Sequence, residues 1–226
     1  MSLTLFFFVV FAPFIFSFVV AFVIFYRSRF SFSALLVLSL FSLLSLLFAS
    51  FAQALLSSLI DLQNASFASI FRAYIYSSFI EECFKILVFY FFSKYLLNRF
   101  LLFKKDDERG EVIKDCNAVS ENTKDSVFLI MFFASSFAGF ENIAYIAIEP
   151  NIWSYRLFSA NLLHILLSPI YARILNNRVS SFFSSIMLAT ILHGSYNFIA
   201  SDVGFLYSYI IIALLLIKNI FYFSRN

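Results

Sequence analysis

The sequence predicts an all-α, polytopic membrane protein, and three observations support this fold class. Hydrophobic residues make up 62% of the 226 residues and charged residues only 13%, whereas about 25% of a soluble domain is charged. The mean hydropathy is +0.90. Apolar stretches of about 20 residues, the length that crosses a bilayer core, recur along the chain. The net charge of +3 is small, so we expect no nucleic-acid partner.

Seven segments are long and apolar enough to form transmembrane helices, and one hydrophilic loop, residues 99–125, follows the third of them. The chain shows no internal repeat and no linker rich in glycine or proline, so residues 1–226 are predicted to form a single integral membrane domain. The first segment lacks the basic start of a signal peptide and is expected to be retained. The predicted spans lie near residues 3–26, 33–59, 70–97, 126–148, 156–173, 181–201 and 203–223.

The positions of lysine and arginine predict how the chain is oriented in the membrane. With seven spans, thirteen of these residues fall on one side, including those of the 99–125 loop, and Arg72 and Arg156 fall on the other. Cytoplasmic loops are enriched in basic residues. We therefore expect the N-terminus outside and the C-terminus in the cytoplasm. Cys83 lies in a span and Cys116 in the loop, so no disulfide is expected.

A few ionisable residues lie inside the predicted spans rather than at their ends. Each such residue costs at least about 2.5–3.5 kcal/mol on insertion scales, and by default it marks a functional site. In this chain they are Glu81, Glu82, Lys85, Glu141, His164 and His193.

The depth of these residues indicates a shared site. Glu81, Glu141, His164 and His193 each lie eight or nine residues from a charged residue at the expected outer boundary of their span. At a rise of 1.5 Å per residue, all four lie about 12–14 Å below the outer surface. Scattered structural residues would not be expected to share one level. The boundary residues are Arg72, Glu149, Arg156 and Asp202.

Helical spacing separates the roles of the two adjacent carboxylates. Glu81 and Glu82 are four and three residues from Lys85, so either can pair with the lysine. Adjacent residues diverge by about 100° around a helix. We therefore expect one carboxylate to face the site and the other to pair with Lys85 or a neighbouring helix. Further polar or aromatic stripes are formed by Phe137, Glu141 and Tyr145, and by His193 and Asn197.

Four motifs in order resemble the PrsW family of intramembrane proteases, relatives of the CAAX prenyl proteases and the bacteriocin-processing enzymes. They are EECFK at Glu81, FAGFENIAY with Phe137, Glu141, Asn142 and Tyr145, a lone His164, and HGSYN with His193 and Asn197. The match covers about residues 79–198, more than half of the chain. Ser168-Pro169 departs from the family pattern, in which a small residue such as glycine is expected, and puts the local helix geometry in question.

The resemblance implies an endopeptidase that hydrolyses a peptide bond within or next to the membrane. Its partners would be the lipid bilayer and a membrane-anchored protein or peptide, for example a regulatory protein like an anti-sigma factor, in the bacterial cytoplasmic membrane. Glu81 is the leading candidate for the general base, although Glu82 is nearly as suitable, and Glu141 would position the water. Lys85 and Glu82 would form a structural pair, and His193 with Asn197 would supply oxyanion donors. Phe137, Asn142 and Tyr145 would support the site.

A metal-dependent version is also open. Glu141, His164 and His193 would make a two-histidine, one-carboxylate set for zinc, with Glu81 as the base beside it. The ligands would come from separate helices, so no local spacing supports the metal over a metal-free mechanism.

Two other classes of function remain as alternatives. A proton- or ion-coupled transporter also places acids and histidines at the membrane midplane, but it typically shows inverted repeats and broken spans, and this chain has four glycines in all. A catalytically inactive relative that binds or protects a membrane partner would keep the same residues.

Overall fold

The structure is a computed structural model, and it describes residues 14, 15, 19, 32–60, 68–95, 123–148, 153–171 and 179–225. These residues are almost entirely helical, which confirms the all-α prediction. The predicted first span, apart from the three isolated residues, and residues 96–122, which include most of the charged loop, lie outside the described part. The helices are α3 (Phe32–Leu59), α4 (Ala68–Phe71), η2 (Arg72–Phe79), α5 (Ile80–Tyr95), α8 (Thr123–Ile148), α9 (Trp153–Tyr171), α10 (Val179–Phe198), η6 (Ile199–Val203) and α11 (Phe205–Arg225).

Three helical stretches of the described residues are long and apolar enough to cross a membrane, namely Phe32–Leu59, Val127–Ile148 and Phe182–Val203. Phe205–Ile220 is a shorter apolar helix. The remaining predicted spans coincide with α4–η2–α5 and with α9, which carry ionisable residues along their length. The seven-span count and the orientation stay predictions.

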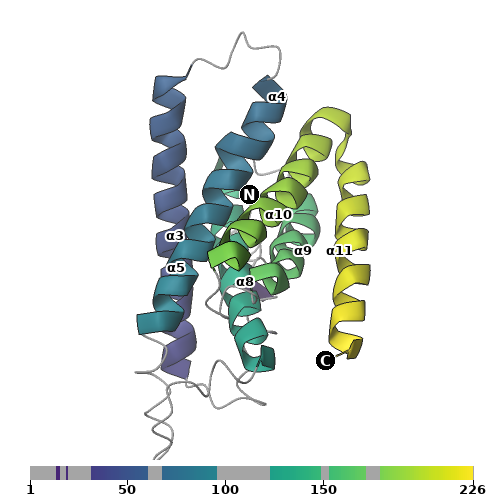
Figure 1. Cartoon of the computed structure of the whole chain (residues 1–226). Coiled ribbons are helices and arrows are strands. Elements are labelled where there is room, and N and C mark those ends of the chain that lie inside the picture. The colour runs from purple at the N-terminus through teal and green to yellow at the C-terminus, as the bar shows by residue number, and fades with distance from the viewer. Residues whose placement is uncertain are drawn as a thin grey trace, which may run out of the picture.

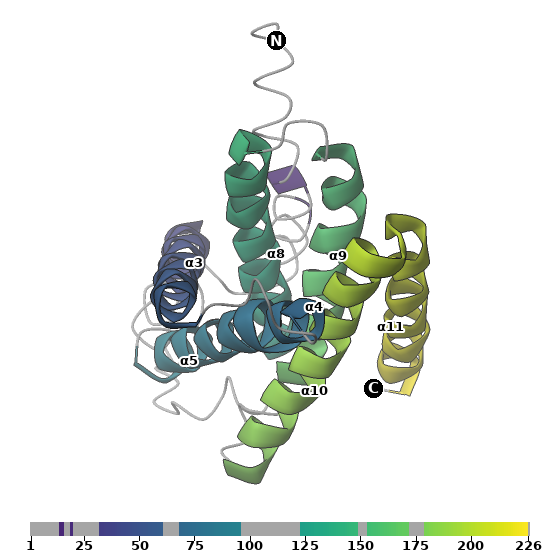
Figure 2. The same ribbon diagram turned by 90° about the horizontal axis from the view of Figure 1, so that it is seen from above.

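Helix α8 lies at the centre of the bundle, with α3 and α9 packed along it (Figure 2). The continuous helix α4–η2–α5 and helix α10 cross in front of it, and η2 packs against α10 (Figure 1). Helices α3 and α11 form opposite flanks in both views. Four helices, α5, α8, α9 and α10, therefore surround the middle of the bundle, where the polar motif residues lie.

Helix α3 packs through a stripe with alternating spacings of three and four residues. Its buried residues include Leu35, Leu38, Ser42, Ser45 and Ala49. Leucines and phenylalanines on the other faces are exposed, as expected for a helix that meets lipid. Serine and alanine in the stripe let the backbones of neighbouring helices approach closely, which is how helices associate where lipid is as apolar as the protein.

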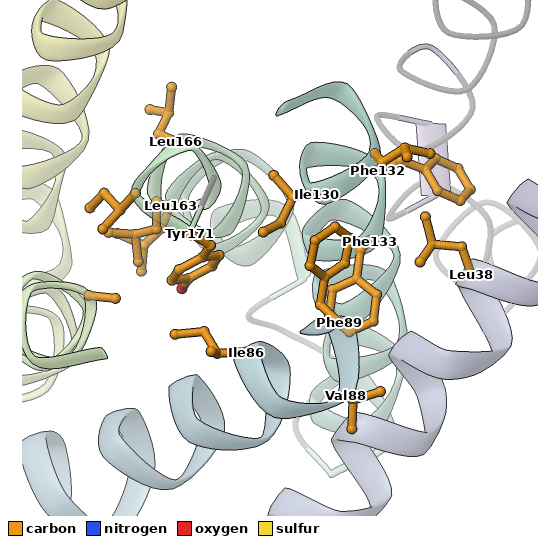
Figure 3. Close-up of a cluster of buried hydrophobic side chains, with 14 of the residues drawn as sticks. Leu38, Ile86, Val88, Phe89, Ile130, Phe132, Phe133, Leu163, Leu166 and Tyr171 are labelled. Carbon is orange, nitrogen blue, oxygen red and sulfur yellow. The ribbon is translucent and has the colours of Figure 1, made fainter. Parts of the chain in front are cut away.

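A hydrophobic core lies between these helices, in the halves that we predict to lie on the cytoplasmic side (Figure 3). Phe89 of α5 and Phe133 of α8 stack edge to face with ring centroids 5.5 Å apart. Ile86 and Leu163, from α5 and α9, are buried in the same cluster. This apolar cluster shares α5, α8 and α9 with the polar motif residues, so it helps to fix the relative positions of these three helices.

Pro169 does not end helix α9, which continues to Tyr171. Proline has no backbone N–H, so the carbonyl four residues earlier, that of Ile165, loses its helical partner. The Ser168 hydroxyl donates to this carbonyl at 2.6 Å. The Ser168-Pro169 pair thus satisfies its own backbone in a non-aqueous environment, and the helix that carries His164 stays regular.

A glycine sets the distance between α10 and η2. A Cβ built on Gly194 would lie 2.4 Å from Cδ1 of the Tyr74 ring. The Tyr74 hydroxyl is 2.8 Å from the hydroxyl of Ser195 and forms a hydrogen bond with it. Any larger residue at position 194 requires the Tyr74 ring or the two helices to shift, and His193 is the preceding residue of the chain.

We predict that Gly194→Ala lowers the thermal unfolding midpoint of the purified protein in detergent. Overpacking typically costs about 1–3 kcal/mol, whereas glycine to alanine in an unobstructed helix gains about 1 kcal/mol, so the sign of the change is diagnostic. In a Tyr74→Ala background the same substitution should be neutral or stabilising, because the ring is gone. A stabilised Gly194→Ala protein with Tyr74 intact would show that the helices are not in close contact here.

Candidate active site

The ionisable residues predicted to lie inside the membrane meet at one place in the bundle. Glu81 and Glu82 come from α5, Glu141 from α8, His164 from α9 and His193 from α10, and all five are buried. The imidazole rings of the two histidines have centroids 4.9 Å apart and are nearly perpendicular. Residues on four separate helices therefore form one polar cluster, as the depth argument required.

Lys85 and Glu82 form the ion pair that the sequence suggested. The Lys85 ammonium contacts Glu82 Oε1, and both side chains are buried. The same oxygen lies 2.7 Å from Nδ1 of His193. Because an unpaired buried charge is very costly, this pair fixes the position of Glu82, and through it the orientation of the His193 ring on α10.

His164 is held by a partner at each ring nitrogen. The Lys85 ammonium lies 2.9 Å from Nδ1, and Glu141 Oε2 lies 2.9 Å from Nε2. An ammonium group can only donate and a carboxylate can only accept, so Nδ1 is the acceptor and Nε2 carries the hydrogen. Phe137 supports the arrangement, since its ring packs edge to face on His164 at 5.6 Å and under the Lys85 ammonium at 4.8 Å.

Arg156 belongs to the cluster, although the sequence analysis placed it at the outer boundary. Its Nη2 donates to Glu141 Oε1 at 2.6 Å, and its Nε donates to Asn142 Oδ1 at 3.0 Å. The guanidinium carbon lies 3.6 Å from the ring centroid of Tyr145. Asn142 in turn donates to Asn161 at 2.9 Å. One sign of this role was present in the sequence, because Arg156 falls on the predicted outer side, where few basic residues lie.

Glu81 is held differently from the other two carboxylates. Gln53 Nε2 and Ser77 Oγ each donate to its Oε1 at 3.2 Å. Its other oxygen, Oε2, is buried and has no hydrogen-bond partner among the described residues. That oxygen lies 3.9 Å from Nε2 of His193. Gln53 lies on α3, in a stretch that carries no motif, and the sequence analysis missed it.

The amide of Asn197 is directed at two serines. Its Nδ2 donates to Ser77 and to Ser78, both at 3.1 Å. Both hydrogens of the amide nitrogen are therefore engaged. The sequence analysis expected Asn197 to donate to a substrate oxyanion, whereas in the structure it supports the serine that holds Glu81.

Three of the clustered residues are placed to share a metal ion. Glu81, His164 and His193 each offer a ligand atom, and these atoms lie within 4.8 Å of one another. Two imidazoles and a carboxylate are a common protein set for zinc at catalytic sites, where the fourth position stays open. The unpartnered Oε2 of Glu81 fits such an ion, because buried polar atoms normally have a partner. Compared with the predicted set, Glu81 takes the place of Glu141.

The charges of the cluster also suit a cation. The side chains of Glu81, Glu82 and Glu141 are opposed by two cationic side chains, Lys85 and Arg156. With neutral histidines the described cluster is one negative charge in excess. A buried excess charge must be balanced by a proton or a bound cation.

Comparison with known proteins agrees with this geometry. The chain matches the model of the PrsW family, described as intramembrane metalloproteases, over residues 9–220. No curated protein matches, and no solved structure matches. The matched region contains every residue of the cluster and the apolar candidate spans. The chain therefore belongs to the PrsW family of intramembrane metalloproteases.

Proposed function

We propose that this protein hydrolyses a peptide bond of a membrane-anchored protein substrate, within or next to the bilayer of the bacterial cytoplasmic membrane. The observation that carries the proposal is the unpartnered, buried Oε2 of Glu81, which faces His193 in a group that also includes His164. A regulatory protein of the anti-sigma-factor kind, with one membrane anchor, is the substrate class that the sequence suggested.

In this proposal Glu81, His164 and His193 would hold a zinc ion. On His164 the ion would take the place of the Nε2 hydrogen and so replace the hydrogen bond from Nε2 to Glu141, while Nδ1 keeps its bond from Lys85. The bound ion would supply Lewis acidity, which polarises the peptide carbonyl and makes an attacking water more acidic. His193 would bind through Nε2, because its Nδ1 is hydrogen-bonded to Glu82. A carboxylate on the far nitrogen of a metal-binding histidine fixes the ring orientation and strengthens the ligand. Glu82 thus orients His193 and does not need to touch the substrate.

Glu141 is the proposed proton acceptor of the site. One of its oxygens, Oε1, is held by Arg156 at 2.6 Å, and the other, Oε2, is directed at Nε2 of His164. A carboxylate with one oxygen fixed and the other facing the reacting atoms is oriented to take a proton from water and pass it to the leaving nitrogen. In the metal-dependent alternative predicted from the sequence these roles are reversed, with Glu81 as base and Glu141 as ligand, and in the metal-free version Glu141 positions the water.

Burial of the cluster supports hydrolysis within the membrane. Glu141 and both histidines are at most 6% exposed. Few water molecules can surround them, so electrostatic interactions within the cluster are strong. The buried ring of Phe137 packs against both Lys85 and His164.

The proposal predicts that purified wild type cleaves a single-span model substrate in nanodiscs and that a zinc chelator abolishes cleavage. Glu81→Gln, Glu141→Gln and His193→Ala should each lower kcat by about 100-fold or more, because each removes a ligand or the proton acceptor. Asp202→Asn, at an exposed carboxylate of η6, is the matched control and should cleave at the wild-type rate.

Two outcomes would decide against parts of this proposal. Cleavage that persists with chelator but is lost in Glu81→Gln would favour the metal-free mechanism with Glu81 as base. Equal cleavage by wild type and all three site variants, at matched protein levels, would contradict a hydrolytic role for the cluster.

Arg156 generates a separate prediction. Arg156→Lys keeps the charge but loses the planar group that bonds Glu141 and Asn142 together and stacks on Tyr145. We expect kcat to fall about 10–100-fold, the range typical of partners that orient a metal site, with little change in KM. In a Glu141→Gln background the substitution should have little further effect on kcat. Additive losses in the two backgrounds would show that Arg156 does not act through Glu141.

A further inference from the structure

We infer that Gln53 and Ser77 are positioning residues that hold Glu81 Oε1 and so present Oε2 to the two histidines. The inference rests on the proposed function, and it brings helix α3 and the π-helical segment η2 into the site. Neither residue belongs to the motifs that revealed the cluster in the sequence.

The three carboxylates of the cluster differ in the charge of their partners. Glu82 is paired with the Lys85 ammonium and Glu141 with the Arg156 guanidinium. The donors on Glu81 Oε1 are an amide and a hydroxyl, both neutral. A neutral donor fixes the geometry of a carboxylate without cancelling its charge. Glu81 is therefore the carboxylate whose charge remains available to a bound cation.

Gln53 is half-buried in a part of α3 that is otherwise mostly exposed. Phe51, Leu55 and Leu59 nearby are 71%, 52% and 73% exposed, so side-chain packing does little to locate this half of the helix. An amide inside a membrane helix requires a partner, and the partner of Gln53 is Glu81 on α5. This bond ties α3 to the site.

Ser77 transmits the position of Asn197 to Glu81. An amide nitrogen can only donate and a carboxylate can only accept, so the Ser77 hydroxyl accepts from Asn197 and donates to Glu81. Ser77 is four residues before Glu81 and lies in η2, where the helix is wound with π geometry. These hydrogen bonds link Asn197 of α10, through Ser77 of η2, to Glu81 of α5. Asn197 therefore affects the position of Glu81 through Ser77.

With Oε1 occupied by two donors, the carboxylate cannot rotate freely, and Oε2 stays on the side of His193. Loss of either donor would let the Glu81 carboxylate turn. The ligand atoms of Glu81, His164 and His193 would then no longer surround one position. The expected consequence is weaker metal binding and slower chemistry, without a direct effect on substrate binding.

The test compares full-length wild type with Gln53→Met, Ser77→Ala and Ser77→Thr, and with Ser58→Ala as the control. Ser58 is on the same helix as Gln53, and its hydroxyl bonds its own backbone at the exposed surface. Zinc affinity is measured in detergent by competition with a chromophoric chelator, and kcat and KM are measured on a cleaved model substrate. Thermal midpoints report whether each variant is folded.

We expect Gln53→Met and Ser77→Ala each to weaken zinc affinity about 10-fold or more, in the range known for residues that orient ligands. They should lower kcat and leave KM within about twofold, because neither residue touches the substrate. Ser77→Thr, which keeps the hydroxyl, and Ser58→Ala should match wild type. In a Glu81→Gln background, Ser77→Ala should cause no further loss of zinc affinity.

Unchanged zinc affinity and kcat in folded Gln53→Met and Ser77→Ala, with an active wild type, would overturn the inference and leave the proposed function intact. Losses that persist equally in the Glu81→Gln background would also overturn it, because the residues would then act elsewhere. A wild type that neither binds zinc nor cleaves would overturn the proposed function itself, and the inference with it.

Discussion

The arrangement of the site depends on the buried ammonium group of Lys85. It contacts Glu82 on its own helix and His164 on α9, and Glu82 contacts His193 on α10. Three helices are thus joined through one charge. Removing one partner of a buried ion pair typically costs about 3–5 kcal/mol, because the other charge is left uncompensated. These contacts therefore favour this relative arrangement of the three helices.

The same need for compensation explains how three buried carboxylates acquire different tasks. Glu82 and Glu141 each have a cation as partner, and each also contacts a histidine. Glu81 has neutral partners on one oxygen and none among the described residues on the other. The free oxygen and the excess negative charge lie together, beside two imidazoles. In physical terms, this is the place in the described structure best suited to a divalent cation.

The sequence predicted the helical class and the meeting of four helices, because ionisable residues in apolar spans are conspicuous and their depth follows from the helical rise. Helical spacing allowed Lys85 to pair with either Glu81 or Glu82, and the family resemblance favoured Glu82. The sequence did not predict that Arg156 and Gln53 contact the site. An arginine side chain is long enough to reach inward from a boundary position, and a glutamine in an apolar helix gives no sign of its partner. The proposed exchange of roles between Glu81 and Glu141 rests on side-chain contacts across helices, which spacing within one helix cannot specify.

Binding of one metal ion by Glu81, His164 and His193 can be measured by X-ray absorption at the zinc edge. Purified wild type loaded with zinc should show nitrogen and oxygen neighbours at about 2.0–2.1 Å, with the multiple scattering of two imidazoles. His164→Ala should lose one of the two imidazole contributions. A wild-type spectrum without imidazole scattering, or one that is unchanged in His164→Ala, would contradict the account.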